Sequence, residues 1–364
     1  MNHIPFEPQP VLILAGGTGG HIFPGIAVAR MLHAQAVPVL WLGADGGMET
    51  RLVPAEGIAI ETINVRAVRG KGVLRLLLSP FMVARAVLQS LAILRRHRPR
   101  AVVSFGGFAA GPGAIAAWLL KTPLLVHEQN RAPGMTNRIL VRIARQVLCG
   151  FPDSFPGRAT QWLGNPVRAP LTMLPEPAKR MREHDAAMRI LVLGGSQGAQ
   201  ALNQALPLAL ARLGTAVPYQ VRHQCGANQH DATRTGYARM QVLASIEPFI
   251  DDMAAAYMWA DLVICRSGAL TLAELCAVGV ASVLVPFPHA VDDHQARNAE
   301  FLSEHAAAVL VPQSPDLARH LAAEILRLHR DRVTLLAMAQ AARALAQPRA
   351  AEQVAEAIIA EALA

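Results

Sequence analysis

The sequence predicts an α/β protein that contains two doubly wound domains, each built on a parallel sheet. The first half opens with an apolar run at residues 11–14, which a glycine-rich turn and a helical pattern follow. The second half opens in the same way at residues 190–193, and its glycine-rich turn leads into a helical pattern over residues 199–213. The turns start at Gly16 and Gly194, which are 194 − 16 = 178 residues apart. This repetition indicates one architecture used twice.

Length and composition agree with this fold class. A chain of 364 residues exceeds one ordinary core, so two domains are expected. With 52% hydrophobic and 16% charged residues, general disorder is excluded. Short apolar strands are expected at residues 101–104, 124–127, 262–265 and 282–285, with longer helical stretches between them. This alternation predicts parallel sheets covered by helices, with a cleft at the carboxyl ends of the strands if the two domains face each other.

Three segments between the expected strands need an interpretation of their own. Residues 101–120 carry no charge and are long enough to span a bilayer, but four glycines and Pro112 interrupt them. We therefore expect a strand, a loop and a helix there, and no transmembrane helix. Glycine and proline at residues 163–167 predict the linker between the domains, and residues 175–188 predict a solvated surface insertion.

The net charge of +8 belongs to the first half of the chain. Residues 1–167 contain 17 Lys and Arg against 7 Asp and Glu, hence +10, whereas residues 168–364 contain 17 against 19, hence −2. No acidic residue occurs from 62 to 127. Such a field favours an anionic partner, either a nucleic acid or an anionic membrane face.

An apolar and basic stretch at residues 69–94 lies within this acid-free region. It predicts either a helix buried against the sheet or a helix that lies at a membrane surface. The local excess of cations favours the membrane surface. The apolar residues expected to contact lipid are Val73, Leu74, Leu77, Leu78 and Phe81, and the basic ones are Arg69, Lys71, Arg75 and Arg85.

The cysteines and the first residues of the chain predict neither a metal site nor a leader. Cys149, Cys225, Cys265 and Cys276 form no C-x-x-C pair and have no metal-ligand spacing to histidine. Reduced thiols in a cytosolic protein are therefore expected. Residues 1–10 do not have the pattern of a signal peptide.

The first glycine-rich turn, G-G-T-G-G-H, offers backbone N–H groups to a phosphate. It is not G-x-G-x-x-G, and the nearest acid that could bind a ribose is Glu49, so an NAD site is disfavoured. It does not match a P-loop either. His21 lies at the mouth of this turn, where a neutral imidazole could accept a proton from a hydroxyl. Capping or packing of the helix start is an equally good interpretation of a single histidine.

Residues 265–274 run from a strand end into a helix and offer small residues and N–H groups to a diphosphate. One turn into that helix, the Glu274 carboxylate suits a ribose diol, or alternatively the dipole at the helix start. No D-x-D motif occurs, which removes the commonest carboxylate pair for a divalent cation. A leaving diphosphate would then be stabilised by arginine and helix ends.

Five motifs together resemble the MurG family of peptidoglycan N-acetylglucosaminyltransferases. They are residues 16–25 (GGTGGHIFPG), 127–130 (HEQN), 164–168 (GNPVR), 194–199 (GGSQGA) and 265–271 (CRSGALT), in the family's order. The resemblance implies a GT-B fold, in which two Rossmann-like domains flank a cleft and the last helix crosses back to the first domain. The acceptor-binding, membrane-associating domain would comprise residues 1–167 and the helix 345–364. The UDP-GlcNAc-binding domain would comprise residues 168–344.

The resemblance also implies the reaction. An inverting transferase of this kind moves GlcNAc from UDP-GlcNAc to the muramyl 4-hydroxyl of the undecaprenyl-diphosphate-linked muramyl pentapeptide. No cofactor and no nucleic acid are expected. The expected partners are those two substrates, an anionic membrane surface and other cell-wall synthesis proteins. The expected location is the cytoplasmic face of the bacterial inner membrane, as a peripheral protein.

Site residues follow from the motifs one by one. His21 is expected to be the catalytic base, with Glu128 as the rival. Arg168 and Ser196 would face the donor diphosphate, Ile250 would meet uracil through its backbone, and Glu274 would bind the ribose. The expected donor-binding residues in full are Thr18, Gly19, Gly20, Asn130, Arg168, Ser196, Ile250, Ala269, Leu270, Thr271, Leu272, Ala273, Glu274 and Gln295. Gln295 would read the sugar hydroxyls, although His294 stands where the family usually has glutamine.

Two other functions are compatible with parts of the sequence. A UDP-GlcNAc 2-epimerase shares the fold but needs no lipid acceptor, so the stretch at 69–94 argues against it. A non-catalytic basic protein that binds membranes or nucleic acid would leave residues 265–274 without a use.

Overall fold

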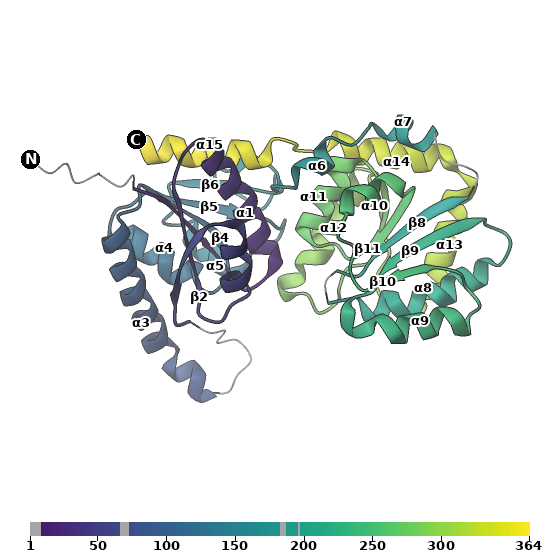
Figure 1. The fold of residues 1–364 in the computed structure, drawn as a ribbon, viewed down its shortest axis with the longest axis horizontal. Coiled ribbons are helices and arrows are strands. Elements are labelled where there is room, and N and C mark those ends of the chain that lie inside the picture. The colour runs from purple at the N-terminus through teal and green to yellow at the C-terminus, as the bar shows by residue number, and fades with distance from the viewer. Residues whose placement is uncertain (1–8, 66–72, 183–186, 196) are drawn as a thin grey trace, which may run out of the picture. The chain divides into compact units, whose positions relative to one another are not determined.

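The computed structural model describes residues 9–65, 73–182, 187–195 and 197–364. The chain divides into two compact units (Figure 1). Unit 1 comprises the chain up to Pro166 together with Arg349–Ala364, and unit 2 comprises Val167–Pro348. The second unit thus begins one residue before the expected position 168, and the return to unit 1 begins at Arg349 instead of 345.

Unit 1 is built on a seven-stranded sheet in the order β3-β2-β1-β4-β5-β6-β7, and all its strand pairs are parallel. The strands are β1 (Val11–Ala15), β2 (Val39–Ala44), β3 (Ala59–Ile63), β4 (Ala101–Gly106), β5 (Leu124–Glu128), β6 (Gln146–Cys149) and β7 (Gln161–Trp162). The chain order reverses direction between β1 and β4, which is where doubly wound sheets bind ligands at the carboxyl ends of their strands.

Helices cover both faces of this sheet because successive side chains of a strand point to opposite faces. Val11 and Ile13 of β1 pack with α1 (Gly19–Ala34) and α15 (Ala350–Leu363). Leu12 and Leu14 pack with α3 (Val73–His97), α4 (Ala110–Leu119) and α5 (Met135–Leu140). The remaining elements are α2 (Glu49–Leu52) and the 3-10 helix η1 (Pro54–Glu56).

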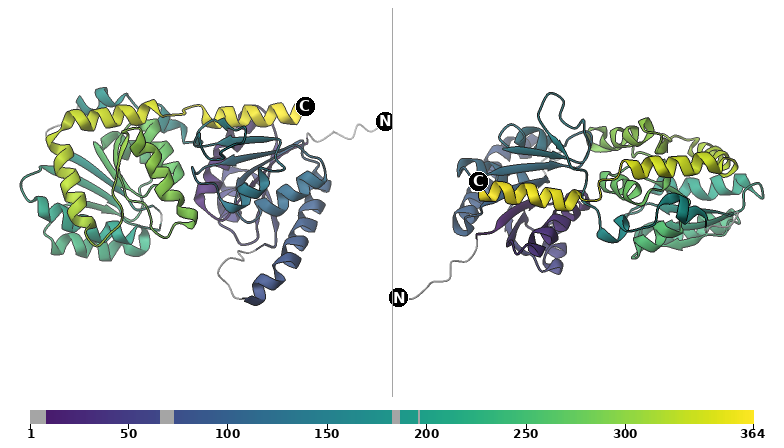
Figure 2. Two further views of the ribbon diagram at one scale, coloured as in Figure 1. Left: turned by 180° about the vertical axis from the view of Figure 1, so that it is seen from behind. Right: turned by 90° about the horizontal axis from the view of Figure 1, so that it is seen from above.

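The last helix, α15, lies against the other elements of unit 1 (Figure 2). Both apolar and polar side chains hold it there. Glu361 accepts a hydrogen bond from Gln146 over 2.6 Å and forms an ion pair with Arg145 over 2.8 Å. The helix at the end of the chain therefore completes the first domain, which agrees with the expected crossing back.

Unit 2 repeats the arrangement with a six-stranded parallel sheet in the order β10-β9-β8-β11-β12-β13. The strands are β8 (Met188–Leu193), β9 (Tyr219–Gln224), β10 (Ser245–Glu247), β11 (Leu262–Cys265), β12 (Ala281–Leu284) and β13 (Ala308–Leu310). The predicted fold class, two parallel-sheet α/β domains of GT-B type, is confirmed.

The main core of unit 2 lies between the sheet and α8 (Gln200–Leu213), α13 (Leu317–Arg330) and α14 (Arg332–Ala344). Figure 1 shows α10 (Met253–Trp259), α11 (Ala269–Val278) and α12 (His294–Glu304) on the other side of the sheet from α8 and α13. The other elements are α6 (Ala169–Thr172), α7 (Pro177–Arg182), η2 (Ala227–Gln229), α9 (His230–Arg239) and η3 (Val291–Asp293).

The prediction of a solvated insertion at residues 175–188 is wrong at Pro177, Arg180 and Met188, which are buried. Arg180 of α7 is only 1% exposed, and it donates hydrogen bonds to the carbonyls of Val278 and Gly279 at the end of α11 over 3.0 and 2.6 Å. Met188 is fully buried as the first residue of β8. The arginine satisfies helix-end carbonyls that would otherwise be buried without a donor.

Residues 101–120 form a strand and a helix, as expected. β4 ends at Gly106, and Gly106 and Gly107 have φ values of +103° and +97° in the turn before α4. In the described part of the chain, no helix has the length and apolar character that crossing a bilayer requires.

Candidate active site

The first glycine-rich turn, between β1 and α1, rests on a buried carboxylate. Glu49 is 0% exposed, and its oxygens accept hydrogen bonds from the N–H groups of Gly17 (3.1 Å) and Ala44 (2.9 Å). A Cβ atom at Gly16 would collide with Glu49 Oε1. Glycine is therefore required here for the carboxylate to fit. Glu49 therefore holds the turn in place, and its burial leaves it inaccessible to a ribose.

His21 lies in the first turn of α1, with its two ring nitrogens in different surroundings. Nδ1 lies 3.2 Å from the carbonyl oxygen of Gly16 and 3.4 Å from the hydroxyl of Thr18. Because a carbonyl oxygen only accepts, the contact with Gly16 places the proton on Nδ1 and leaves a lone pair on Nε2. A Cβ atom at Gly106 would lie 3.2 Å from Nε2, so the absent side chain keeps this edge of the ring open.

Glu128, at the carboxyl end of β5, is 2% exposed and accepts hydrogen bonds at both oxygens. Oε1 accepts from the backbone and side-chain nitrogens of Asn130 over 2.9 and 3.2 Å. Oε2 accepts from the backbone of Gly134 over 3.1 Å and from Asn137 Nδ2 over 2.9 Å. Glu128 therefore holds together the loop from β5 to α5, and its lone pairs are largely occupied.

Asn137 lies beside the same glycine as His21, and nothing in the sequence pattern pointed to it. It is 3% exposed, and its Nδ2 atom lies 3.7 Å from the position that a Cβ atom of Gly106 would take. Unit 1 thus brings His21, Gly106, Asn137 and Glu128 together at the carboxyl edge of its sheet.

His127 is fully buried beside Glu128 and belongs to the scaffold. Burial lowers its pKa to about 4, so the ring is neutral at physiological pH. Its Nε2 donates to the carbonyl of Gly164 over 3.0 Å, and its Nδ1 accepts from Gln129 over 3.2 Å. This contact fixes the last turn of unit 1 before the chain enters unit 2.

Two exposed aromatic residues flank the first turn. Phe23 and Phe108 are 53% and 50% exposed. A Cβ atom at Gly19 would lie 2.9 Å from the Phe23 ring, and one at Gly17 would lie 3.7 Å from the Phe108 ring. The turn therefore carries an apolar border, which periodicity in the sequence could not reveal.

The second glycine-rich turn follows β8 in unit 2. Gly195 and Gly198 each have a φ of +77°, and a Cβ atom at Gly198 would collide with the carbonyl of Cys225. Ser196, expected to face the diphosphate, lies outside the described residues. Ile250, expected to meet uracil, is 2% exposed and follows β10 closely.

The expected diphosphate and ribose segment forms the start of α11. Gly268 precedes the helix in an extended conformation. Ala269 and Leu272 are buried, whereas Leu270, Thr271 and Ala273 are partly exposed. The partial positive charge of a helix N-terminus suits an anion at this position.

Glu274, one turn into α11, is held from two sides. Arg168 Nη2 donates to its Oε1 over 3.2 Å, and the hydroxyl of the buried Tyr257 donates to its Oε2 over 3.1 Å. Burial raises the pKa of Glu274, while the positive charge of Arg168 opposes that rise. The structure thus brings Arg168 and Glu274 together, and adds Tyr257, which the sequence pattern did not single out.

Gln295 is the second residue of α12 and is anchored to neighbouring loops. Its Oε1 accepts from the backbone N–H of Phe287 over 2.9 Å, and its carbonyl accepts from Ser267 over 2.7 Å. Arg266 belongs to the predicted segment 265–274, but the prediction gave it no role of its own. It donates to the carbonyls of Val285 and Pro286 over 2.9 and 3.1 Å, and so fixes the loop after β12.

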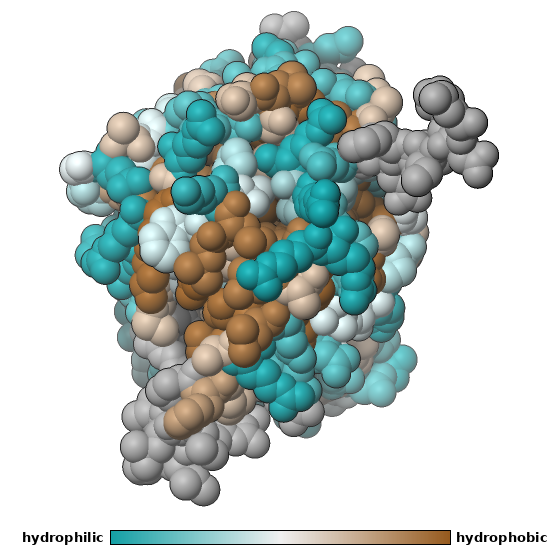
Figure 3. Space-filling view, turned by 90° about the vertical axis from the view of Figure 1, so that its left-hand side faces the viewer, coloured by the Kyte–Doolittle hydropathy of each residue, from teal (hydrophilic) through white to brown (hydrophobic). Residues whose placement is uncertain are grey.

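Exposed apolar side chains gather on unit 1 over three helices that pack in series, α3 on α4 and α4 on α5. We call them the apolar patch, and Figure 3 shows this brown area with hydrophilic residues around it. Its members are Phe81, Val83 and Leu88 of α3, Trp118 and Leu119 of α4, and Ile139 of α5. Exposed basic residues on or beside the same helices are Arg85, Lys121, Arg138 and Arg142.

The stretch expected to contact lipid falls partly on this patch. Phe81 is 76% exposed, which excludes a helix buried along its whole length. Arg85 is exposed as well. Val73, Leu74, Arg75, Leu77 and Leu78 lie in the first turns of α3, and Arg69 and Lys71 lie outside the described residues.

Among the described residues, no group of three or more His, Cys, Asp and Glu side chains is placed to hold a metal ion. All four cysteines are free and buried. Burial raises the pKa values of Cys149, Cys265 and Cys276 to about 12. The thiols are therefore not placed to act as nucleophiles.

Comparison with protein families defines the class. Residues 11–149 match the glycosyltransferase family 28 N-terminal domain, and residues 189–354 match the family 28 C-terminal domain. The two matched segments correspond to the two sheets, so the fold and the matches define a glycosyltransferase.

Individual relatives narrow this class. A UDP-N-acetylglucosamine–N-acetylmuramyl-(pentapeptide) pyrophosphoryl-undecaprenol N-acetylglucosamine transferase of Xanthomonas campestris pv. campestris (strain 8004) is 59% identical over 360 residues, 99% of this chain and 84% of the relative. The crystal structure of Acinetobacter baumannii MurG superposes with a TM-score of 0.85 at 42% identity, covering 97% of this chain and 100% of that one. The chain belongs to the MurG family of N-acetylglucosamine transferases.

A UDP-GlcNAc 2-epimerase from Neisseria meningitidis is similar in fold alone. Its structure matches with a TM-score of 0.67 at 12% identity, covering 96% of this chain and 100% of that one. The shared architecture does not carry the epimerase reaction to this chain.

Proposed function

We propose that this chain transfers GlcNAc from UDP-GlcNAc to the muramyl 4-hydroxyl of the undecaprenyl-diphosphate-linked muramyl pentapeptide, with inversion at the anomeric carbon. The observation that carries the proposal is the identity of 59% over 360 residues with a transferase named for these substrates. The geometry then supports a different role for each unit, in which unit 1 acts on the acceptor and unit 2 holds the donor.

His21 is the base in this proposal. The acceptor hydroxyl oxygen forms a bond to the anomeric carbon while the bond from that carbon to the diphosphate breaks and UDP leaves with the electron pair. The hydroxyl proton goes to Nε2 of His21, whose lone pair is available because Nδ1 faces the Gly16 carbonyl at 3.2 Å. The imidazolium then carries a positive charge, which the Gly16 carbonyl dipole stabilises.

Glu128 positions the acceptor loop in this proposal instead of acting as the base. A base needs a lone pair directed at the hydroxyl, and the oxygens of Glu128 already accept from Asn130, Gly134 and Asn137. Through these bonds it presents Asn130 to the sugar and keeps Asn137 beside Gly106 and His21.

Unit 2 binds the donor through groups of different chemistry. The N-terminus of α11 and Arg168 supply positive charge to the diphosphate, which grows more negative as the anomeric bond breaks. Glu274 accepts hydrogen bonds from the ribose diol, and the backbone of Ile250 reads uracil. Gln295 directs its amide to the sugar hydroxyls while Phe287 holds its oxygen.

In this proposal unit 1 binds an anionic membrane surface, and the apolar patch with its basic neighbours supports this. Apolar side chains enter the headgroup boundary, and arginine and lysine contact lipid phosphates. A peripheral position on the cytoplasmic face of the bacterial inner membrane gives unit 1 access to a lipid-linked acceptor.

Incubation with radiolabelled UDP-GlcNAc and the lipid-linked acceptor tests the proposal. We expect label in the lipid phase that depends on the acceptor. Conversion of UDP-GlcNAc to its 2-epimer without lipid label would favour the epimerase, and binding to vesicles without any turnover would favour a non-catalytic membrane protein.

A further inference from the structure

The segment from Cys225 to His230 joins two stretches that the proposed function assigns to the donor. On one side lies the glycine-rich turn after β8. Gln229 Nε2 donates to the carbonyl of Gln197 over 3.3 Å, and a Cβ atom at Gly226 would collide with the backbone nitrogen of Gly198. The segment therefore packs directly against the glycine-rich turn after β8.

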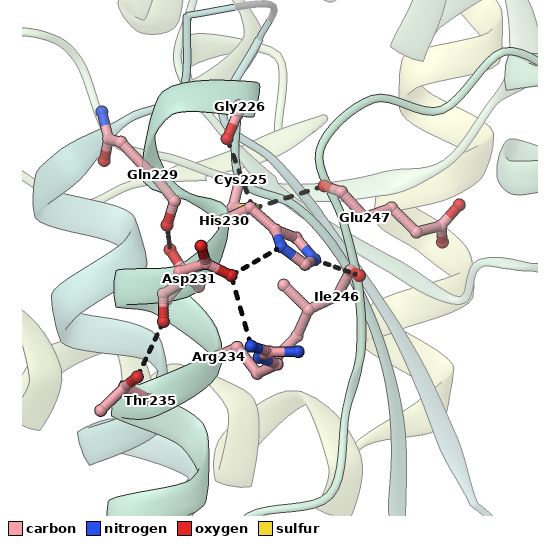
Figure 4. A network of polar contacts seen from close by, with 10 residues as sticks. Cys225, Gly226, Gln229, His230, Asp231, Arg234, Thr235, Ile246 and Glu247 are labelled. Carbon is pink, nitrogen blue, oxygen red and sulfur yellow. Dashed lines mark hydrogen bonds and ion pairs between the residues drawn. The ribbon is translucent and has the colours of Figure 1, made fainter.

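On its other side, the same segment holds the strand that leads to Ile250. The Cys225 backbone N–H and thiol both donate to the carbonyl of Glu247, over 3.0 and 3.4 Å. His230 Nε2 donates to the carbonyl of Ile246 over 3.3 Å, as Figure 4 shows. One short segment thus contacts both the phosphate turn and the approach to the nucleobase residue.

A buried relay of side chains fixes the orientation of the Gln229 amide. Tyr237 donates its hydroxyl proton to His223 Nδ1 over 2.9 Å, and His223 Nε2 donates to Asn203 Oδ1 over 3.0 Å. Asn203 Nδ2 donates to Gln229 Oε1 over 2.7 Å and to the Cys225 carbonyl over 2.9 Å. With its oxygen accepting from Asn203, Gln229 presents its NH2 group to Gln197.

The direction of this relay is set at Asn203. Its Nδ2 donates to the Cys225 carbonyl, which can only accept, so its Oδ1 accepts from His223 Nε2. His223 is 0% exposed, and burial lowers its pKa to about 4, so the ring is neutral and has one donor and one acceptor. Burial also raises the pKa of Tyr237, so its hydroxyl keeps the proton that it donates. Every bond from Tyr237 to Gln197 therefore points the same way.

We propose that Gln229 is a positioning residue for the diphosphate-binding turn and that the Tyr237–His223–Asn203 relay holds it in place. This inference rests on the proposed function, in which unit 2 binds UDP-GlcNAc. Gln229 acts through Gln197 on the turn that carries Gly195 and Gly198. The nucleobase side of the segment is held by contacts that do not involve Gln229, those of Cys225 with Glu247 and of His230 with Ile246. Loss of the Gln229 contact therefore weakens binding of the diphosphate and leaves binding of uridine unchanged.

The test compares inhibition constants of uridine and UDP, each as a competitor of UDP-GlcNAc, in the full-length enzyme. Gln229→Met removes the donor and acceptor without adding charge. We expect UDP to bind about tenfold more weakly, the effect of one or two hydrogen bonds, and uridine to stay within about twofold. The KM for UDP-GlcNAc rises, whereas kcat at saturation and the KM for the acceptor do not change.

Two further variants sharpen the comparison. Gln220→Met makes the same change at an exposed position on β9 and leaves both inhibition constants as in the wild type. Tyr237→Phe removes only the first donor of the relay, and we expect UDP to weaken about threefold with uridine unchanged. If Gln229→Met does not fold, the Tyr237→Phe variant tests the inference in its place.

Equal loss of UDP and uridine binding, or no loss of either, would overturn the inference. If the wild type binds UDP and the Gln229→Met and Tyr237→Phe variants bind it equally well, the result contradicts the relay but not the proposed function. A wild-type protein that binds neither UDP nor UDP-GlcNAc contradicts the proposed function on which the relay rests.

Discussion

Arg168 and Glu274 form an ion pair, with Arg168 Nη2 at 3.2 Å from Glu274 Oε1. Arg168 follows directly on the start of unit 2 at Val167, and Glu274 lies one turn into α11. The proposed function assigns the first to the donor diphosphate and the second to the ribose. We therefore infer that donor binding exchanges this contact for contacts with two adjacent groups of the same ligand, while Tyr257 continues to hold Glu274.

Glu274→Gln tests the ribose contact. The amide keeps one acceptor but loses the charge, so we expect the KM for UDP-GlcNAc to rise about tenfold, as for loss of a charge-assisted hydrogen bond. Discrimination between UDP and 2′-deoxy-UDP as inhibitors falls at the same time. Glu300→Gln, a partly exposed carboxylate on α12, is the control. Unchanged discrimination in Glu274→Gln would show that the carboxylate does not bind the ribose.

Glu128→Gln separates positioning from base catalysis. An amide cannot accept all the hydrogen bonds that reach Glu128, and its NH2 group faces the donors of Gly134 or Asn137. We expect the free energy of unfolding to fall by about 2 kcal/mol, because buried donors lose their acceptor. Urea denaturation measures this loss, and kcat measured with both substrates saturating should fall less than tenfold. A loss of kcat above 100-fold at unchanged stability would instead make Glu128 the base.

Removal of apolar side chains from the patch tests membrane contact. Phe81→Ser combined with Leu88→Ser should weaken binding to vesicles of anionic phospholipid about 100-fold, at about 1.5 kcal/mol for each side chain. Binding of UDP-GlcNAc should not change. Leu243→Ser, at a residue of unit 2 that is 90% exposed, is the matched control and should leave vesicle binding intact.

Neutralising the basic residues of the stretch 69–94 tests the electrostatic part of membrane binding. Replacement of Arg69, Lys71, Arg75 and Arg85 by Gln should weaken binding to anionic vesicles at low salt, by about 1 kcal/mol for each charge at the surface. Co-sedimentation at two salt concentrations measures the effect. Equal losses of vesicle and UDP-GlcNAc binding would contradict the division of labour between the units.

Stability should fall as the pH decreases from 6.5 to about 4. Burial lowers the pKa values of His127 and His223 to about 4, whereas both titrate near 6.5 in the unfolded chain. In this window the unfolded state takes up protons that the folded state does not, so the free energy of unfolding decreases by up to about 1.4 kcal/mol per pH unit for each histidine. Above pH 6.5 these two histidines are neutral in both the folded and the unfolded state, so they no longer make the free energy of unfolding depend on pH.

Urea denaturation of the wild type and His223→Gln at pH 7 and pH 5 measures this contribution. The variant is less stable at pH 7 because the relay is altered, but its stability depends less on pH. An identical pH dependence in the two proteins would show that His223 does not remain neutral in the folded state.

The sequence predicted the two sheets and both glycine-rich turns because these depend on local signals. The buried strands appear as apolar runs such as 11–14 and 262–265, and a glycine cluster after each run marks the turn. β1 and β11 lie where these runs predicted them. The positions of His21 and Glu274 followed for the same reason, since each is near the start of a helix that the pattern already defined.

The polar scaffold could not be predicted in this way because its partners are far apart in the chain. Glu49 has no distinguishing mark in the sequence. Its role appears only in the fold, where it accepts a hydrogen bond from Gly17, which lies 32 residues earlier in the chain. The role of Asn137 depends on its contact with Glu128 and its position beside Gly106. The role of Arg180 depends on distant carbonyls, among them that of Val278, which is 98 residues away in the chain. A charged residue in a Pro-containing segment looks solvated until those contacts are known.

The kcat of His21→Asn, measured with donor and acceptor saturating, tests the central claim most directly. Asparagine keeps the polarity of the site but has no group that takes up a proton. We expect kcat to fall at least about 100-fold, as for loss of a general base, with UDP binding unchanged. His33→Asn, at an exposed histidine of the same helix, should retain wild-type kcat. If His21→Asn retains most of its kcat, His21 is not the base.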